Sequence, residues 1–310
     1  MRALQYDAYG GIEKLQLRQA PEPRTSGPLV RVSVAALNPK DALFRKGKFR
    51  QLSGRHFPKS CGVDFAGQIE RDSGDFRAGD LVFGALQEWT FSRGSLADLV
   101  APEPGELARV PEGVDPAHAA SLALVGLTAL QAFRDVARMK TGAKVLINGA
   151  SGGVGTASVQ IARLLGAEVT TVSSEGTHAL CRELGAHHAA GYAQLDEFSR
   201  SGRFDVVFDV FGNLDFTRMR GALAPRGVFV STVPSVARVF RDVFTRWSKQ
   251  QERLVVVKPR RADLEQLAGW LAKRDLRAVI DSQFALEDYA AAFARLESKK
   301  AHGKILITVA

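Results

Sequence analysis

A chain of 310 residues is long enough for two domains that each bury a core of their own. The composition is typical of a globular protein, and the net charge of +9 favours anionic partners such as nucleotide phosphates. The most apolar run, residues 119–127, is too short to span a bilayer, and no basic and apolar leader opens the sequence. The two cysteines, Cys61 and Cys181, have no disulfide or metal-binding spacing, so we expect a reducing, cytoplasmic location.

The first 116 residues predict a β-rich domain, because short strand-like runs alternate with glycine and proline turns. The runs cover residues 3–6, 29–35, 67–70, 81–83 and 96–100. Between them, Asn38-Pro39 favours a turn. Asp64 lies inside an apolar run, where a carboxylate needs a partner, and Lys40 or Arg45 can supply it.

After Pro116 the apolar pattern becomes helical through residue 136, and from Lys144 onward strand and helix patterns alternate. This alternation predicts a doubly wound parallel sheet with right-handed crossovers. The strands are expected at 144–147, 168–172, 206–210, 227–231 and 254–257, and the helices at 153–165, 177–184, 214–223 and 262–273. The tail, 276–310, predicts a strand, a helix and a last strand that can return to the first domain.

One stretch, Lys144-Val-Leu-Ile-Asn-Gly-Ala-Ser-Gly-Gly-Val-Gly155, organises the second domain. A strand, a glycine-rich turn and a helix start follow one another, which is the arrangement that binds the pyrophosphate of a dinucleotide. The first position of the motif is alanine instead of the more common glycine. The cofactor-binding residues predicted here are Ala150, Ser151, Gly152, Gly153 and Val154.

The end of the next strand bears on the choice of cofactor. An acidic residue there would bind the ribose 2′-hydroxyl of NAD, but this chain has Ser173 and Ser174, which do not repel a 2′-phosphate. NADPH is therefore favoured. Glu175 can instead take the ribose role, and no lysine or arginine lies between Ser173 and Ala179.

Later strand ends complete the predicted cofactor site. In a parallel sheet the carboxyl ends of all strands meet at one edge, where ligands bind. Val210 and Gly212 follow one strand, and Ser231 and Thr232 follow the next. We expect all four to border the cofactor.

Five motifs in order along the chain now carry a resemblance. They are Asn38-Pro-x-Asp41, Gly62-x-Asp64-x-Ala66-Gly67, Gly149-Ala-Ser-Gly-Gly-Val-Gly155, Asp209-x-x-Gly212 and Gly303-Lys304-Ile-Leu-Ile. Together they resemble the zinc-independent quinone oxidoreductases of the medium-chain dehydrogenase/reductase superfamily. The resemblance implies a GroES-like catalytic domain (1–116 and 276–310) around a Rossmann NADPH-binding domain (117–275). It also implies a cleft between the domains and a homodimer joined by edge strands, here residues 254–257.

The resemblance also assigns individual residues. Asn38 would lie near the nicotinamide and donate its amide N–H to a substrate carbonyl, and Thr128 would contact the nicotinamide end. Tyr192 would lie by the adenosine phosphate, and Lys304 near the cleft. Two tyrosines and a basic residue common in the family are Leu43, Phe49 and Thr177 here.

The zinc ligands of related alcohol dehydrogenases fall at Asn38, Val63 and about Leu124, none of which binds zinc, so no metal site is predicted. Without a Lewis acid, alcohol oxidation is disfavoured. Reduction of a quinone or an α,β-unsaturated carbonyl compound needs hydride, placement and a hydrogen bond. We therefore expect an NADPH-dependent reductase of such a substrate. The alternative is a non-catalytic NADPH-binding protein that senses redox state or binds RNA.

One segment departs from the family pattern. Val236, Val239, Phe240, Val243, Phe244 and Trp247 fall on one face of a predicted helix, and basic residues fall mostly elsewhere. A membrane-surface helix is one interpretation. We favour the other, in which the apolar face packs over the substrate cleft or against a dimer partner.

Overall fold

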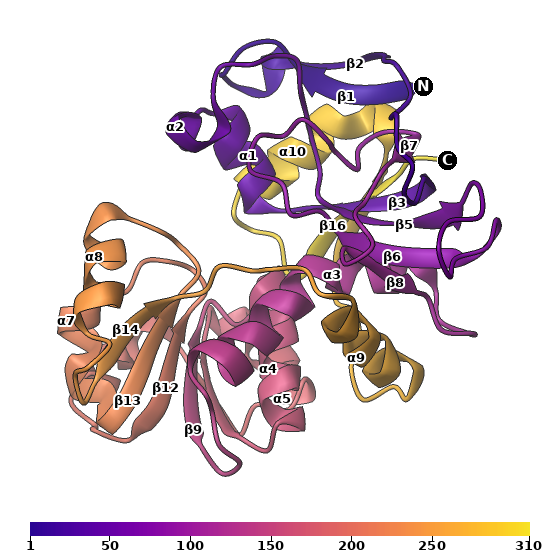
Figure 1. Cartoon of the computed structure of the whole chain (residues 1–310). Helices are drawn as coiled ribbons and strands as arrows, with labels where there is room; N and C mark the ends of the chain where they lie inside the picture. The colour runs from indigo at the N-terminus through magenta and orange to yellow at the C-terminus, as the bar shows by residue number, and fades with distance from the viewer. The chain divides into compact units, whose positions relative to one another are not determined.

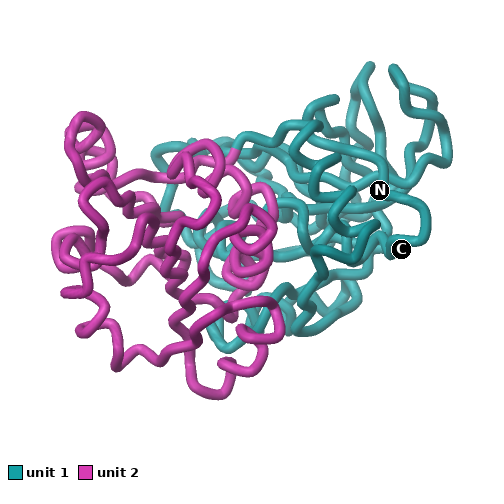
Figure 2. Tube along the Cα trace, turned by 90° about the horizontal axis from the view of Figure 1, so that it is seen from below, with its two compact units in different colours: residues 1–124, 258–310 teal, residues 125–257 magenta.

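The computed structural model describes all residues, 1–310, and divides them into two compact units (Figure 2). Unit 1 comprises residues 1–124 and 258–310, and unit 2 comprises residues 125–257. The sequence predicts boundaries at 116/117 and 275/276, so both differ from the observed ones. The second boundary moves because α9, Arg261–Ala272, packs on β8, Leu107–Arg109, in unit 1. Arg261 of this helix also forms an ion pair of 2.6 Å with Asp75.

Unit 1 is built on a seven-stranded sheet in the order β15-β16-β3-β5-β6-β8, with β7 paired to β3. Besides β8, the strands are β3 (Val30–Leu37), β5 (Asp64–Ile69), β6 (Leu81–Ala85), β7 (Leu99–Val100), β15 (Ile280–Ala285) and β16 (Lys304–Thr308). A second sheet pairs β1 (Arg2–Tyr6) with β2 (Leu15–Gln19) and β4 (Lys59–Ser60). Because β16 pairs antiparallel with β3, the tail of the chain completes the first domain.

The helices of unit 1 include two, α1 and α2, that the sequence pattern did not predict. They are α1 (Pro39–Arg45), α2 (Arg50–Ser53), α9 and α10 (Tyr289–Glu297). The Asn38-Pro39 pair was expected to form only a turn, but it begins α1. Proline suits the first helical position, and the Asp41 carboxylate accepts a hydrogen bond of 2.8 Å from the backbone N–H of Asn38.

Unit 2 contains six parallel strands in the order β11-β10-β9-β12-β13-β14. The strands are β9 (Lys144–Asn148), β10 (Glu168–Val172), β11 (His188–Ala190), β12 (Phe204–Asp209), β13 (Leu223–Ser231) and β14 (Gln251–Leu254). This order is that of the doubly wound Rossmann fold, whose strand order reverses between β9 and β12. The edge strand β14 overlaps the predicted strand, residues 254–257, only at Leu254.

Helices cover both faces of this sheet, with α4 and α5 on one side and α7 and α8 on the other (Figure 1). The helices that lie wholly in unit 2 are α4 (Gly153–Leu164), α5 (His178–Glu183), α6 (Leu195–Phe198), α7 (Phe216–Met219) and α8 (Val236–Phe244). Helix α3 (Pro116–Gln131) begins in unit 1 and ends in unit 2. A π-helical turn, Ala132–Val136, extends α3. The resulting helix, Pro116–Val136, is long and apolar enough to cross a bilayer by length and composition, although 78% of its apolar window is buried within the protein, as in a core helix.

Candidate functional site

The glycine-rich turn between β9 and α4 has the tight geometry that a pyrophosphate site requires. Gly149 has φ of +83°, and a Cβ on Gly155 would lie 2.2 Å from the carbonyl oxygen of Gly149. Because α4 begins at Gly153, its first backbone N–H groups have no acceptor within the helix. These groups and the positive end of the helix dipole fit the two phosphates of a dinucleotide.

Other predicted cofactor residues of unit 2 also lie at the carboxyl ends of the parallel strands. Val210 and Gly212 follow β12, Ser231 ends β13, and Tyr192 lies two residues after β11. Thr232 donates a hydrogen bond of 3.1 Å from its hydroxyl to the carbonyl oxygen of Val210, which joins the loops after β12 and β13. Parallel strands thus gather residues from distant parts of the sequence beside the glycine turn.

The two serines after β10 differ in their surroundings. Ser173 is fully buried, and its hydroxyl oxygen accepts a hydrogen bond of 2.9 Å from Thr177. Ser174 is exposed. Ser174, with its exposed neighbour Glu175, is therefore the residue that can meet a ribose or 2′-phosphate, whereas Ser173 supports the turn from inside.

A buried polar network that the sequence pattern did not predict holds the loops after β12 and β13. The fully buried Asp209 carboxylate accepts hydrogen bonds from the Asn148 amide (2.8 Å) and the Gly212 N–H (2.9 Å). It also forms an ion pair of 3.3 Å with Arg238 of α8. Burial raises the pKa of Asp209, and these hydrogen bonds oppose that shift.

Arg238 ties both loops to α8. Its guanidinium donates to the Ser231 hydroxyl (2.6 Å) and to the carbonyl oxygens of Val233 (3.0 Å) and Leu214 (2.6 Å). The side chain is only 9% exposed. The one signal of this network in the sequence is Asp209 itself, an acidic residue inside the apolar strand 206–210, which needs a partner when buried.

Unit 1 contains a second buried network around Asn38. The Lys304 ammonium donates to Asp64 (2.9 Å), to the Asn38 amide oxygen (2.6 Å) and to the Leu37 carbonyl oxygen (2.9 Å). The Asn38 amide nitrogen donates to Asp64 (3.0 Å) and to the Ala36 carbonyl oxygen (3.2 Å). The network therefore positions the Asn38 side chain rigidly.

This network corrects the expected partner of Asp64. Lys40 instead donates to the Glu88 carbonyl oxygen, and Arg45 pairs with Glu297. Lys304, which is predicted to lie near the cleft, meets Asp64 because β16 lies beside β3 and β3 lies beside β5. Its three donors are all used within unit 1. The predicted Thr128 lies in unit 2 on α3, and it is buried.

Asp41, at the start of α1, is buried next to this network. Its carboxylate accepts hydrogen bonds from the backbone N–H groups of Asn38 (2.8 Å) and Gly62 (3.2 Å). Burial nevertheless raises its pKa to about 6. The folded protein therefore holds a proton at Asp41 more tightly than the unfolded chain does.

This shift predicts a pH-dependent stability. Because the folded pKa is raised, the stabilising contribution of Asp41 is present below about pH 4 and is lost as the pH rises through about 6. We expect the stability advantage of wild type over Asp41→Asn to shrink by on the order of 2 kcal/mol between pH 4 and pH 7. Urea unfolding of both proteins across this range measures the difference, and a constant gap would contradict the assignment.

No three His, Cys, Asp or Glu side chains are grouped so that they could hold a metal ion. At the three positions where related alcohol dehydrogenases bind zinc, Asn38 lies in the network above and Val63 is fully buried. The Leu124 backbone N–H donates to Asp64 (2.9 Å). The donor set at these positions therefore does not fit zinc.

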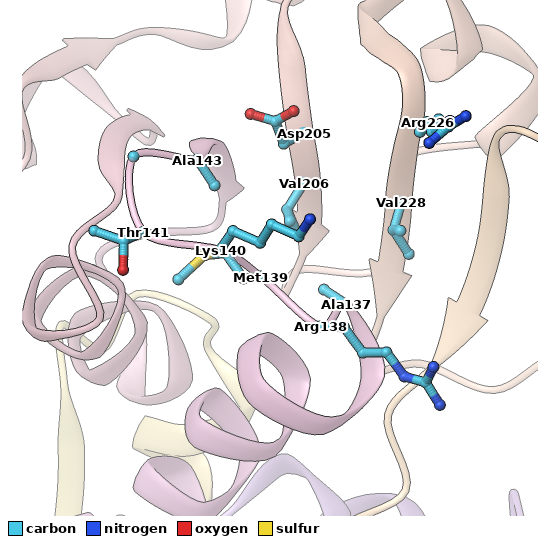
Figure 3. Close-up of a pocket in the computed structure, with 11 residues that line it drawn as sticks. Ala137, Arg138, Met139, Lys140, Thr141, Ala143, Asp205, Val206, Arg226 and Val228 are labelled. Atoms are coloured by element: carbon cyan, nitrogen blue, oxygen red, sulfur yellow. The ribbon is translucent and has the colours of Figure 1, made fainter.

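A groove of about 400 Å³ lies at the opposite end of the unit 2 sheet (Figure 3). Residues 137–143 line one part of it, and residues at the beginning of β12 and in β13 line the rest. Three exposed cations border it, Arg138, Lys140 and Arg226, together with Asp205. None of the predicted cofactor residues lines this groove.

Comparison with known proteins shows which family the chain resembles. A family model described as "Alcohol dehydrogenase GroES-like domain" matches residues 26–112, and one described as "Zinc-binding dehydrogenase" matches residues 184–307. A trans-enoyl reductase of Aspergillus terreus is 33% identical and aligns over 100% of this chain and 96% of its own. The chloroplast envelope quinone oxidoreductase homolog of Arabidopsis thaliana is 30% identical, with coverage of 99% and 98%.

The structural comparison agrees with the sequence relatives. The quinone oxidoreductase from Coxiella burnetii has a TM-score of 0.91 and 28% sequence identity, covering 100% of this chain and 99% of that one. The chain belongs to the medium-chain dehydrogenase/reductase superfamily, whose members bind a nicotinamide dinucleotide. Within it, the chain groups with the quinone oxidoreductases, and it is an oxidoreductase. The predicted family and fold class are confirmed.

Proposed function

We propose that this protein is an NADPH-preferring reductase that transfers hydride to a quinone or an α,β-unsaturated carbonyl compound without zinc. The observation that carries the proposal is the pairing of an intact dinucleotide turn with Asn38, Val63 and Leu124 at the zinc positions. Relatives named as quinone oxidoreductases and enoyl reductases support the substrate class.

The residues of unit 2 fit a dinucleotide. Gly155 leaves the space that a closely approaching turn needs, and the first N–H groups of α4 can bind the pyrophosphate. The bound cofactor would supply hydride. We assign the remaining contacts to Ala150–Val154, Val210, Gly212, Ser231 and Thr232, with Thr128 toward the nicotinamide and Tyr192 toward the adenosine.

Preference for NADPH is supported by the exposed Ser174 hydroxyl at the position where an acid would select NAD. Glu175 beside it carries a negative charge that opposes a 2′-phosphate. We therefore expect a modest preference, measurable as a ratio of dissociation constants for NADPH and NADH.

Asn38 is the proposed hydrogen-bond donor to the substrate carbonyl. Both N–H groups of its amide donate hydrogen bonds within the protein, to Ala36 and to Asp64. The hydrogen bond to Ala36 is the longer of the two, and it is the one that a substrate carbonyl would replace. The Lys304 ammonium on the amide oxygen polarises the amide and makes its N–H groups better donors. The quinol anion or enolate that hydride transfer would form can then take its proton from water.

The test follows nicotinamide absorbance after the protein is mixed with NADPH and a panel of quinones and enones. We expect turnover that a zinc chelator leaves unchanged. Binding of NADPH without turnover of any substrate would favour the non-catalytic alternative, and absence of NADPH binding would contradict both functions.

Two glycine variants, one at the turn and one distant from it as a control, test the cofactor site. A Cβ at position 155 overlaps the Gly149 carbonyl, so we expect Gly155→Ala to weaken NADPH binding about tenfold or more because the turn must shift. A Cβ at Gly269 of α9 would lie within 4 Å of no atom beyond its chain neighbours and the backbone of its own helix, so Gly269→Ala should bind NADPH like wild type.

We also propose a homodimer and a cytoplasmic location. Strand β14 forms one edge of the unit 2 sheet and is paired only with β13, so its free edge can pair with a second copy. Both cysteines are free and buried, which fits a reducing compartment. Sedimentation velocity measures the oligomeric state.

A further inference from the structure

Helix α8 presents its apolar side chains to solvent. Val236, Val239, Phe240, Val243, Phe244 and the nearby Trp247 are all exposed, and Trp247 is 87% exposed. We call these six residues the apolar stripe. From the exposed fractions of Phe240, Phe244 and Trp247 (59%, 72% and 87%), the three aromatic side chains alone leave roughly 400 Å² in solvent, at about 200 Å² each. An apolar patch of this size is comparable to the largest patch of a typical monomer, which is often functional.

The stripe faces outward because polar residues attach α8 to the sheet. Arg238 is bound by Asp209 and Ser231, and Arg241 pairs with the buried Glu252 of β14. Thr245, just after the helix, accepts a hydrogen bond of 2.9 Å from the backbone N–H of Glu252. Breaking these buried contacts to turn the helix over would leave the two carboxylates without cations.

The direction of the stripe limits what can cover it. At about 100° per residue, the centre of the stripe lies on the opposite side of the helix from Arg238 and Arg241. Because α8 packs against β14, the exposed stripe points away from the sheet. Figure 1 shows the backbone of α8 beside this sheet. A second copy paired with the edge of β14 would extend the sheet within its own plane and would leave the stripe exposed.

The charges around the stripe favour an anionic surface. Arg246 and Lys249, which follow α8 in the sequence, are exposed. Between Val236 and Gln250 the one acidic residue is Asp242, which is 16% exposed and pairs with Arg253 (3.2 Å) and Arg246 (3.6 Å). Exposed aromatic and aliphatic side chains flanked by basic residues are the composition of helices that lie in the interface of an anionic bilayer.

We infer that α8 docks the protein on an anionic lipid surface. The apolar stripe enters the headgroup region, and Arg246 and Lys249 meet lipid phosphates. The inference does not depend on the proposed reductase activity, although such a surface is also where apolar quinones dissolve.

Vesicle co-sedimentation of the full chain, without cofactor, tests the inference. We expect wild type to bind vesicles of phosphatidylcholine containing phosphatidylglycerol, and to bind pure phosphatidylcholine more weakly. The double variant Phe240→Gln, Phe244→Gln should bind the anionic vesicles more weakly than wild type, by a factor of about ten at least. The matched control, Leu81→Gln with Leu164→Gln, removes two exposed leucines elsewhere and should bind like wild type.

Sedimentation velocity of the same proteins distinguishes a lipid surface from the rival occupant of the stripe, a second copy of this chain. If the α8 variant dissociates a dimer and binds vesicles as well as the control does, the stripe is an interface between copies and the inference is overturned. Failure of wild type to bind anionic vesicles at low salt also overturns it. Thermal unfolding of each variant verifies that the exposed substitutions leave the fold intact.

Discussion

Replacing Lys304 by methionine is expected to lower the free energy of unfolding by about 3–5 kcal/mol, because it leaves the buried Asp64 carboxylate without its cation. Asn38 also loses the donor to its amide oxygen. We therefore expect kcat/KM to fall for the folded fraction of the variant. Urea unfolding and steady-state kinetics measure the two effects.

Lys59 provides a matched control for this variant. It is also a buried lysine, but its ammonium donates only to the carbonyl oxygens of Ser53 (2.6 Å) and Thr90 (2.8 Å). Lys59→Met therefore leaves no buried carboxylate uncompensated and should cost clearly less stability. Equal decreases in the free energy of unfolding of the two variants would show that pairing with Asp64 does not make Lys304 more important for stability than Lys59. Arginine at position 304 keeps the charge and should recover part of the stability.

Replacing Arg238 by methionine is expected to have two effects. Asp209 loses its cation inside the protein, so the free energy of unfolding should fall by about 3–5 kcal/mol. The loops after β12 and β13 lose the group that joins them, so the dissociation constant for NADPH should rise about tenfold or more. Fluorescence titration with NADPH, made under conditions where the variant is folded, measures the second effect.

Arg241→Met separates loop positioning from general stability. Arg241 also belongs to α8, and it pairs with Glu252 and Asp215, but it has no hydrogen bond to the loop residues that Arg238 holds. We expect it to lower stability while the dissociation constant for NADPH stays within about twofold of wild type. If both variants weaken NADPH binding equally, Arg238 acts only through the stability of the domain.

The sequence by itself determined the Rossmann unit, because its information is local. A strand, the glycine turn and a helix start are contiguous from Lys144 to Leu164, and glycines are needed where the backbone approaches itself closely. The alternation of strand and helix patterns then requires a parallel sheet. The five motifs, in their order along the chain, were also sufficient to predict the family.

Only the tertiary structure decided how buried charges are paired. Lys304 meets Asp64 across 240 residues of sequence because their strands lie in one sheet, and no local pattern encodes that distance. The orientation of α8 was hidden for the same reason. The periodicity of the sequence showed that α8 has an apolar and a basic face, but not which of them faces the sheet. The buried carboxylates Asp209 of β12 and Glu252 of β14 bind the arginines, so the basic face lies inward and the apolar stripe lies outward.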